Sequence, residues 1–315
     1  MGEVVHDGIR AESGRGPALG LEGMVELAGG SFRMGSEAFY PEERPVRVAE
    51  VGRFWIDRDP VTVKQFRRFA RATGYITLAE REPRAEEYPG ARPDLLVPGS
   101  AVFHRTAGPV DLNDVRSWWS YVPGASWDRP EGPESRTYDR ANHPVVHVAY
   151  EDAEAYARWA GKALPTESEW EYAARGGLDG ATFTWGEELM PGGRPAGNWW
   201  QGEFPWQNLL LDGWERTSPV GTYPANGFGL HDMCGNVWEW TCSPFDLDIT
   251  EEPESPCCSG GVRQAPHHPR RVIKGGSHLC APNYCLRFRP AARQAETVDT
   301  STSHIGFRCV VRDRT

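Results

Sequence analysis

Apolar residues recur at the spacing of an α-helix between Thr62 and Thr73. A helix turns once in about 3.6 residues, so positions three and four apart share a face. Gly74 follows, at the position where a left-handed glycine commonly ends a helix. The pattern predicts an amphipathic helix whose inner face carries Val63, Phe66, Phe69 and Ala70.

Two further helices are predicted in succession. The segment 150–160 has alanines and one tyrosine on one face and is followed by Gly161. The next helix begins at Thr166, because Thr166-Glu167-Ser168-Glu169 has the form of a capping box. In that motif the threonine and a glutamate three residues later each accept a hydrogen bond from the other's backbone N–H. This helix is expected to end at Gly176-Gly177.

The alternation typical of strands is short and interrupted. The segment 24–35 alternates apolar and small residues around Gly29-Gly30, which predicts a hairpin, and Phe54–Asp57 predicts a strand. The segment 80–114 is rich in proline and has no regular period. We interpret it as an irregular, lid-like excursion that continues into an aromatic loop around Trp118.

No stretch with the composition of a linker divides the rest of the chain. We therefore predict a flexible N-terminal tail, residues 1–20, and one irregular α+β domain, residues 21–315. The 35 Gly and 26 Pro indicate a loop-rich fold with short regular elements. The 13 Trp are too large to be hidden completely, so we expect many of them to line a surface groove as well as the core.

Charge and hydropathy exclude several classes of partner. The formal net charge of −10 argues against nucleic acid and against an anionic membrane surface. It is compatible with a basic peptide. No apolar run approaches the length of about 18 residues that a membrane-spanning helix needs. The first 20 residues lack the apolar core of a signal peptide.

The seven cysteines favour a reducing cytoplasm, because a secreted disulfide framework would more often hold an even and denser set. Two of them, Cys280 and Cys285, follow a Gly-Gly-Ser turn. Such a pair can close a disulfide, contribute half of a zinc site, or present two thiolates to a soft ion such as Cu(I). Zinc would need two more ligands, and His278 offers one. The choice between disulfide and soft-metal or redox site stays open from spacing alone.

Two segments offer oxygen ligands of the kind that calcium takes. One brackets a loop with Asn198-Trp199 and Asp212-Gly213-Trp214, and the other spans residues 232–239, with the carbonyls of Gly235 and Val237 between two carboxylates. Residues of these types also simply make turns and caps. From spacing alone the turn interpretation is favoured.

Several long motifs, in order, resemble those of the formylglycine-generating enzymes, the sulfatase-modifying factor family. They include GGSFRMGS (29–36), the run from His143 to Gly177, NWWQGEFP (198–205), ANGFGLHDMCGNVWEW (225–240) and GGSHLCAPNYC (275–285). The resemblance covers nearly the whole domain. The cysteine pair matches the catalytic branch of the family.

The resemblance implies a single irregular domain related to C-type lectin folds and acting as a monomer. It implies a copper-dependent oxidase that uses O2 to convert the Cys of a Cys-x-Pro-x-Arg motif in an unfolded or nascent sulfatase to Cα-formylglycine. Cys280 and Cys285 would hold Cu(I), with Ser277 beside them as a catalytic residue. Substrate contacts would come from Trp118, Tyr284, Arg287 and His304.

The resemblance also implies two structural calcium sites, on Asn198, Trp199, Asp212 and Trp214, and on Asp232, Gly235, Val237 and Glu239. The chain departs from the family's pattern at Ala281, often a histidine, and at His304, often an asparagine. The carboxylates that would read the substrate arginine are not identified; Asp111, Asp114 and Glu131 are candidates by charge. Cys257 and Cys258 have no role that we can derive.

Two other functions fit the same fold. A nonheme-iron sulfoxide synthase would need a helical domain with iron-binding histidines, and none is expected before the domain. A non-catalytic peptide-binding module would not need the cysteine pair. His143 and His147 are expected to be structural. His231 and His278 are as compatible with a structural role as with a role in the pocket.

Overall fold

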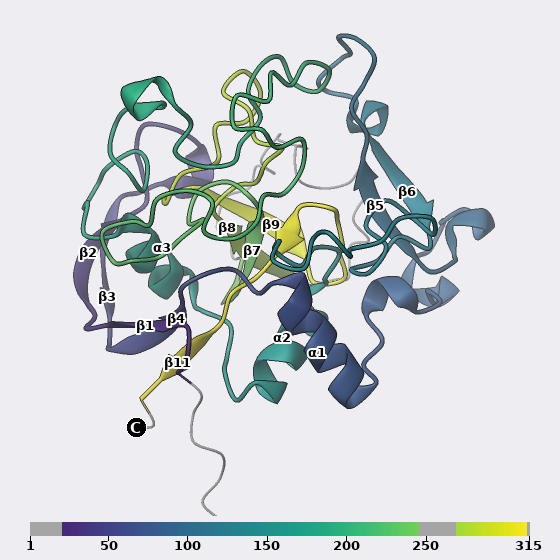
Figure 1. Cartoon of the computed structure of the whole chain (residues 1–315), viewed down its shortest axis with the longest axis horizontal. Helices are drawn as coiled ribbons and strands as arrows, with labels where there is room; N and C mark the ends of the chain where they lie inside the picture. The colour runs from purple at the N-terminus through teal and green to yellow at the C-terminus, as the bar shows by residue number, and fades with distance from the viewer. Residues whose placement is uncertain (1–20, 246–268, 314–315) are drawn as a thin grey trace, which may run out of the picture.

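A four-stranded sheet lies in the middle of the computed structural model, which describes residues 21–245 and 269–313 (Figure 1). The predicted tail and the Cys257-Cys258 pair fall outside these residues. The strand order is β10-β7-β8-β9, with β10 parallel to β7 and the other neighbours antiparallel. The strands are β7 (Trp238–Pro244), β8 (Arg270–Lys274), β9 (Arg293–Thr297) and β10 (Ile305–Gly306).

A second sheet joins the two described ends of the chain. Strand β4 (Phe54–Asp57) lies between β1 (Met24–Leu27) and β11 (Val310–Arg312), and both pairings are antiparallel. Ile56 of β4 is opposite Val25 on one side and Val310 on the other. The predicted strand at Phe54–Asp57 is confirmed.

The hairpin predicted over residues 24–35 is wrong, although both of its halves are strands. β1 pairs with β4, while β2 (Gly30–Met34) pairs with β3 (Arg47–Val51). Gly29 lies between β1 and β2 at φ +78°, where a Cβ would come within 2.3 Å of the Val51 carbonyl oxygen. The chain therefore changes sheet at this glycine, a turn that alternation alone does not reveal.

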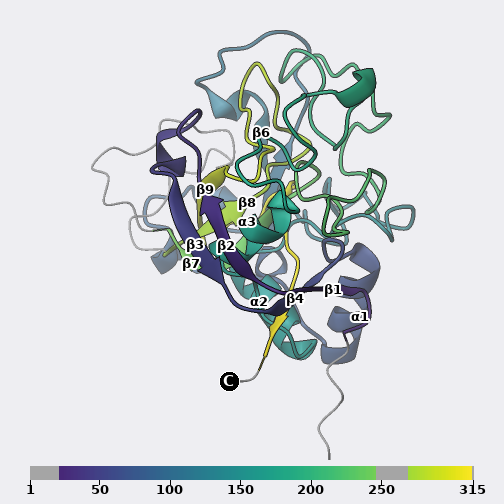
Figure 2. The same cartoon turned by 90° about the vertical axis from the view of Figure 1, so that its left-hand side faces the viewer.

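The three predicted helices are confirmed, as α1 (Val63–Thr73), α2 (Tyr150–Trp159) and α3 (Glu167–Arg175). Thr62 and Thr166 cap α1 and α3 in complete capping boxes. Gly74 and Gly176 end the same two helices in the left-handed conformation. Helix α3 packs against the β2–β3 hairpin and against the central sheet (Figure 2).

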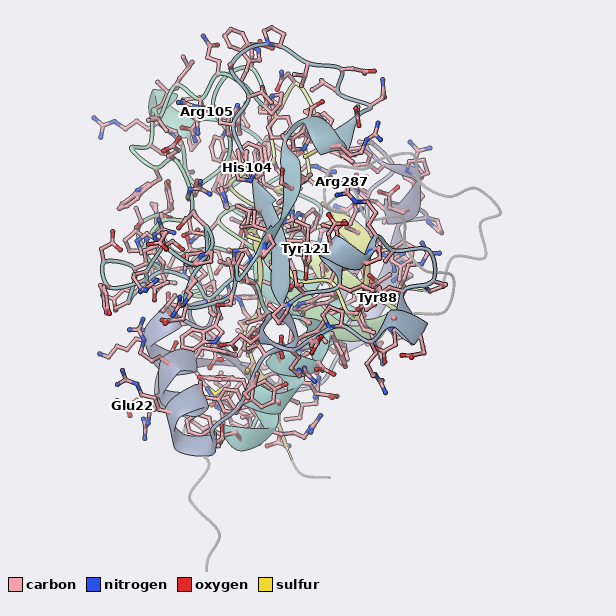
Figure 3. All side chains as sticks on the ribbon, turned by 90° about the vertical axis from the view of Figure 1, so that its right-hand side faces the viewer. Glu22, Tyr88, His104, Arg105, Tyr121 and Arg287 are labelled. Carbon is pink, nitrogen blue, oxygen red and sulfur yellow. The ribbon has the colours of Figure 1, made fainter. Side chains whose placement is uncertain are left out.

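The proline-rich excursion is only partly irregular. Its residues Gly99–Phe103 form β5, entirely buried and paired with β6 (Trp119–Pro123). The lid-like interpretation is therefore wrong for β5, as is the loop predicted at Trp119. The preceding part is held down by Tyr88, whose hydroxyl donates to Asp299, and by Tyr121, whose hydroxyl donates to the Val97 carbonyl (Figure 3).

Single 3₁₀ turns make up the remaining helical structure of the described residues. They are Pro41–Glu43, Leu78–Glu80, Ala85–Glu87, Pro93–Leu95, Val115–Ser117 and Pro191–Gly193. In the described part of the chain, no helix is both long and apolar enough to cross a bilayer.

Aromatic side chains fill the core more than they line a groove. Eight of the 13 Trp expose less than a tenth of their surface, in contrast to the prediction: Trp118, Trp119, Trp127, Trp170, Trp199, Trp200, Trp238 and Trp240. The largest apolar cluster joins α1, α2 and the central sheet, and it includes both Cys280 and Cys285. A neighbouring cluster lies under β5 and β6.

Candidate functional site

The predicted cysteine pair lies in a loop that leaves the end of β8, and we call residues 277–288 the cysteine loop. Gly275 and Gly276 precede it at φ +95° and +69°. A Cβ on Gly276 would lie 2.7 Å from the backbone of Phe288. Glycine is therefore required here, because the two ends of the loop meet backbone to backbone.

Both thiols are buried in the same apolar cluster. Cys280 exposes 1% and Cys285 2% of its surface, and neither is in a disulfide. The Ser277 N–H lies 3.4 Å from the Cys280 sulfur, and the Ser277 hydroxyl oxygen accepts from the Leu279 N–H. The Cys285 N–H donates to the Ala281 carbonyl at 2.8 Å. The loop thus places the Cys280 thiol beside the Ser277 N–H, and both thiols lie in one apolar cluster.

Two adjacent tryptophans support the cysteine loop, one at Cys280 and one at Phe288. The Trp199 ring stacks on Phe288, with centroids 4.8 Å apart and planes 2° from parallel. The next residue, Trp200, donates its backbone N–H to the Cys280 carbonyl at 2.9 Å. Residues 199–200 therefore hold both the start and the end of the cysteine loop.

Two other aromatic residues contact Tyr284, between the cysteines. Phe204 stacks on the Tyr284 ring at 4.7 Å, and Trp118 meets the same ring edge-on at 5.7 Å. Trp118 is buried, whereas Tyr284 is half-buried and its neighbours Pro282 and Asn283 are exposed. Tyr284 therefore packs, half-buried, against the apolar cluster that contains the thiols, and the buried Trp118 contacts its ring.

One histidine of the cysteine loop, His278, and one outside it, His304, are neutral, buried rings. His278 makes a 2.8 Å hydrogen bond from Nδ1 to the Asn236 carbonyl, and burial lowers its pKa to about 4. His304 bonds Thr302 through Nδ1, and its ring packs 4.9 Å from that of Trp119. Burial lowers the pKa of His304 well below 6.5, and its Nε2 has no partner within the described structure.

Three further histidines among the described residues have partners within the fold. His147 is buried, with Nδ1 on Ser100 and Nε2 on the Pro130 carbonyl, and His143 contacts Thr217. These two side chains have the structural roles that the sequence predicts. His231 bonds the Tyr223 carbonyl.

Arg287 does not fit a direct contact with substrate. It is fully buried and forms a 2.5 Å ion pair with Glu42, while its Cζ lies 3.8 Å from the centre of the Tyr40 ring. Its charge is therefore already neutralised inside the protein.

The two predicted calcium segments lie against each other. Asn236 donates its backbone N–H to the Asn198 carbonyl at 2.7 Å. In the first segment, Asp212 accepts hydrogen bonds from the Trp214 N–H, the Tyr223 hydroxyl and the Gln201 amide. This carboxylate and the nearby carbonyls suit a hard cation, which would replace some of these donors.

In the second segment, Glu239 does not fit a calcium ligand. Its carboxylate pairs with Arg308 through two hydrogen bonds of 2.7 and 2.8 Å and also accepts from the Trp170 indole at 2.7 Å. Arg308 and Glu239 are completely buried. A cation at Glu239 would face an adjacent guanidinium charge. The remaining oxygens of the predicted ligand set are those of Asp232 and the carbonyls of Gly235 and Val237.

Two of the three carboxylates proposed for the substrate arginine are already paired. Asp114 binds Arg116 at 2.7 Å, and Glu131 binds Arg140 at 2.5 Å. Asp111 accepts from Asn113 at 3.0 Å.

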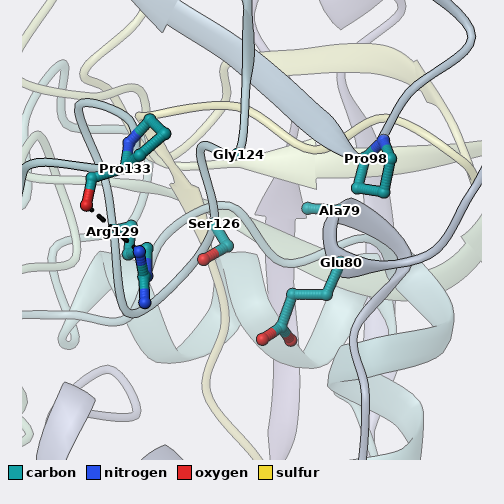
Figure 4. A pocket seen from close by; sticks show the side chains of 7 residues that line it. All are labelled: Ala79, Glu80, Pro98, Gly124, Ser126, Arg129 and Pro133. Atoms are coloured by element: carbon teal, nitrogen blue, oxygen red, sulfur yellow. Dashed lines mark hydrogen bonds between the residues drawn. The ribbon is translucent and has the colours of Figure 1, made fainter.

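A separate hollow of about 240 Å³ lies at the other end of the β5–β6 hairpin (Figure 4). Its charged residues have internal partners, since Glu80 accepts from Trp127 and Arg129 donates to the Pro133 carbonyl. The hollow is lined by Ala79, Glu80, Pro98, Gly124, Ser126, Arg129 and Pro133.

No three His, Cys, Asp or Glu side chains group into a metal site within residues 21–245 and 269–313.

The residues that support the loop are not evident from the sequence. Trp200 and Phe204 lie in the motif at 198–205, beside a predicted calcium ligand, and nothing in that motif links them to the cysteines. Their aromatic character is a signal, but only the fold shows which loop they contact.

Comparison with known proteins agrees with this architecture. Residues 10–313 match the sulfatase-modifying factor enzyme 1-like domain. The formylglycine-generating enzyme of Mycobacterium tuberculosis is 55% identical over 92% of this chain and 98% of its own length. The mouse enzyme of that name is 40% identical over 92% of this chain and 75% of its own length.

Two less similar proteins are also informative, one by its name and one by its fold. The bovine protein named inactive C-alpha-formylglycine-generating enzyme 2 is 37% identical over 91% of this chain and 87% of its own length. The structure of PvdO from Pseudomonas aeruginosa matches with a TM-score of 0.58 at 24% identity, covering 91% of this chain and 93% of that one. That likeness concerns the fold alone. The fold and the relatives together show that the chain belongs to the sulfatase-modifying factor enzyme 1-like family.

Proposed function

We propose that this protein converts the cysteine of a Cys-x-Pro-x-Arg motif in sulfatases to Cα-formylglycine, with O2 as oxidant and Cu(I) held by Cys280 and Cys285. One observation carries the proposal: two thiols, not joined to each other, lie buried in one apolar cluster. Relatives named formylglycine-generating enzyme support the substrate class. Because a relative named inactive has the same domain, the proposal rests on this pair and not on the fold.

The donor set fits the metal. Thiolates are soft ligands that select Cu(I) over hard cations. Bound copper would supply the one-electron chemistry that couples O2 reduction to loss of a hydrogen from the substrate Cβ. Overall, the conversion consumes one O2, two protons and two electrons from an external thiol. It releases water and the substrate sulfur as hydrogen sulfide, and leaves the aldehyde.

The chain's own residues prepare this site. The Trp200 N–H fixes the Cys280 carbonyl, and Ser277 fixes the turn that carries the Cys280 sulfur. Tyr284, stacked on Phe204 and packed against the cluster that holds the thiols, would exclude water from them. The exposed edge at residues 282–283 is the side from which a peptide would approach.

The test is a mass-spectrometric assay on the full chain. Protein loaded with Cu(I) is mixed in air with a thiol reductant and the peptide Leu-Cys-Thr-Pro-Ser-Arg, and a metal-free sample is the control. We expect copper-dependent loss of the peptide thiol and gain of an aldehyde that hydroxylamine traps. Binding of the peptide without conversion would instead support the peptide-binding module.

We also propose a structural calcium ion at the first segment, on Asn198, Trp199, Asp212 and Trp214. A ligand that binds only the folded state stabilises it, by about 2.7 kcal/mol at one hundred times its Kd. Calcium is therefore expected to raise the melting temperature, and a chelator to reverse the rise. Asp212→Asn should abolish the response, whereas the same change at Asp94, which is exposed and pairs with Arg92, should leave it intact.

The reaction needs Cys280 and Cys285 as thiols, a state that a reducing compartment maintains. We therefore propose the cytoplasm as the place of action, with the protein working as a monomer on an unfolded or nascent sulfatase.

A further inference from the structure

The residue that follows Cys285 is fixed at both of its backbone groups. The Leu286 N–H donates to the Tyr40 hydroxyl at 3.1 Å, and the Leu286 carbonyl accepts from Nε of Arg289 at 2.6 Å. Tyr40 lies 246 positions earlier in the chain. A side chain from the N-terminal part of the domain therefore holds the exit of the cysteine loop.

The same upstream segment immobilises Arg289. Its guanidinium donates to both oxygens of Glu43, at 2.9 and 2.5 Å. Its Cζ lies 3.6 Å from the centre of the Phe39 ring. Both members of the ion pair are almost completely buried. A bidentate pair of this kind fixes direction as well as distance, so the Arg289 bond to Leu286 is fixed in turn.

Arg287 makes a parallel set of contacts, with Glu42 and with the face of Tyr40. We call residues 39–43 the clamp segment. This segment contacts three of the four residues that follow Cys285, through a hydrogen bond, ion pairs and ring faces. The exit of the cysteine loop is therefore tied to one short stretch of the N-terminal part of the domain.

Cys285 is thus held from two sides, by the clamp segment after it and by the Ala281 carbonyl before it. A metal bound between two sulfurs needs both at matched positions. Groups that orient a ligand from outside the coordination shell change metal affinity by about 10–100-fold when they are removed. We propose that the clamp segment positions the Cys285 thiolate for the metal, with Tyr40 and Glu43 as positioning residues. This inference rests on the proposed copper function.

The test compares Tyr40→Phe with Tyr138→Phe. The first change removes the acceptor of the Leu286 N–H and keeps the ring against Arg287. The second removes the same atom from a side chain that is 84% exposed. Cu(I) affinity of the full chain is measured by competition with a chromophoric Cu(I) chelator, and melting temperature is measured on the metal-free protein. Glu43→Gln serves as a second variant.

We expect Tyr40→Phe to lower Cu(I) affinity by about 10-fold or more, with Glu43→Gln changing it in the same direction and Tyr138→Phe leaving it at the wild-type value. A lower melting temperature with unchanged Cu(I) affinity would overturn the inference, because it is the result of a purely structural role. Failure of the wild-type protein to bind Cu(I) would instead overturn the copper assignment, and the inference with it.

Discussion

Cys280→Ser and Cys285→Ser are each expected to lower turnover of the Cys-x-Pro-x-Arg peptide by more than about 100-fold, since removing even an outer-shell group can cost that much affinity at a metal site. A hydroxyl is a poor ligand for a soft ion, so one thiolate cannot hold Cu(I) as two do. Turnover in the mass-spectrometric assay and Cu(I) binding by chelator competition should fall together.

The control for these variants is Cys234→Ser. Cys234 is buried in the same apolar cluster, exposing 2% of its surface, and burial raises the pKa of its thiol to about 12. Serine there introduces the same buried hydroxyl at a position outside residues 277–288. We expect Cys234→Ser to show the same loss of stability as the two loop variants but, unlike them, to retain activity. Near-normal turnover in either loop variant would exclude the two-thiolate copper site.

The largest loss of stability is expected from Glu171→Gln. Glu171 is 1% exposed and accepts from Lys274 at 2.9 Å, Arg175 at 2.7 Å and the Gly35 N–H at 2.8 Å. Removing one partner of a buried ion pair leaves the other charge uncompensated, which typically costs about 3–5 kcal/mol. Two cations lose part of their compensation here, so the free energy of unfolding should fall by about that amount in urea titrations at pH 7.

The loss of stability caused by Glu171→Gln should become smaller as pH falls. Burial alone would raise the pKa of Glu171, but Lys274 and Arg175 outweigh it and hold the pKa below its ordinary value of 4.5. A depressed pKa in the folded state stabilises the protein above the unfolded value and loses that effect as pH falls. The difference between wild type and Glu171→Gln should therefore shrink below about pH 4.5.

Glu154→Gln is the matched comparison, because Glu154 pairs with Arg158 on the surface of α2. A pair of this kind contributes about 0.3–0.5 kcal/mol. An equal loss of stability in the two variants would show that Glu171 is not a buried electrostatic centre.

Local patterns in the sequence predict the helices well and the sheets poorly. Thr62, Gly74, Thr166 and Gly176 act through bonds within four residues, so their positions alone indicate where helices begin and end. Strand pairing depends on distant partners. β1 and β2 are adjacent in the chain but belong to different sheets, and β5 is hidden in a proline-rich segment that has no alternation.

In the candidate site, too, local features are evident from the sequence and contacts between distant residues are not. The cysteine pair and Ser277 lie within nine residues of one another, and the Ser277 N–H contacts the Cys280 sulfur. Tyr40 and Leu286, by contrast, form their bond across 246 positions, and nothing near either residue indicates it. Arg287 looks like a substrate contact in the sequence, and only its ion pair with Glu42 shows that its charge is used inside the protein.

The sheet that joins the two ends of the domain has a consequence for protein synthesis. β4 ends at Asp57, but its second neighbour begins only at Val310. At a translation rate of about 5–20 residues per second, those strands emerge about 13–50 s apart. During that interval one edge of β4 has no native partner, and an unpaired edge is a template for pairing with other chains. The nascent protein therefore depends on its last strand to complete the sheet.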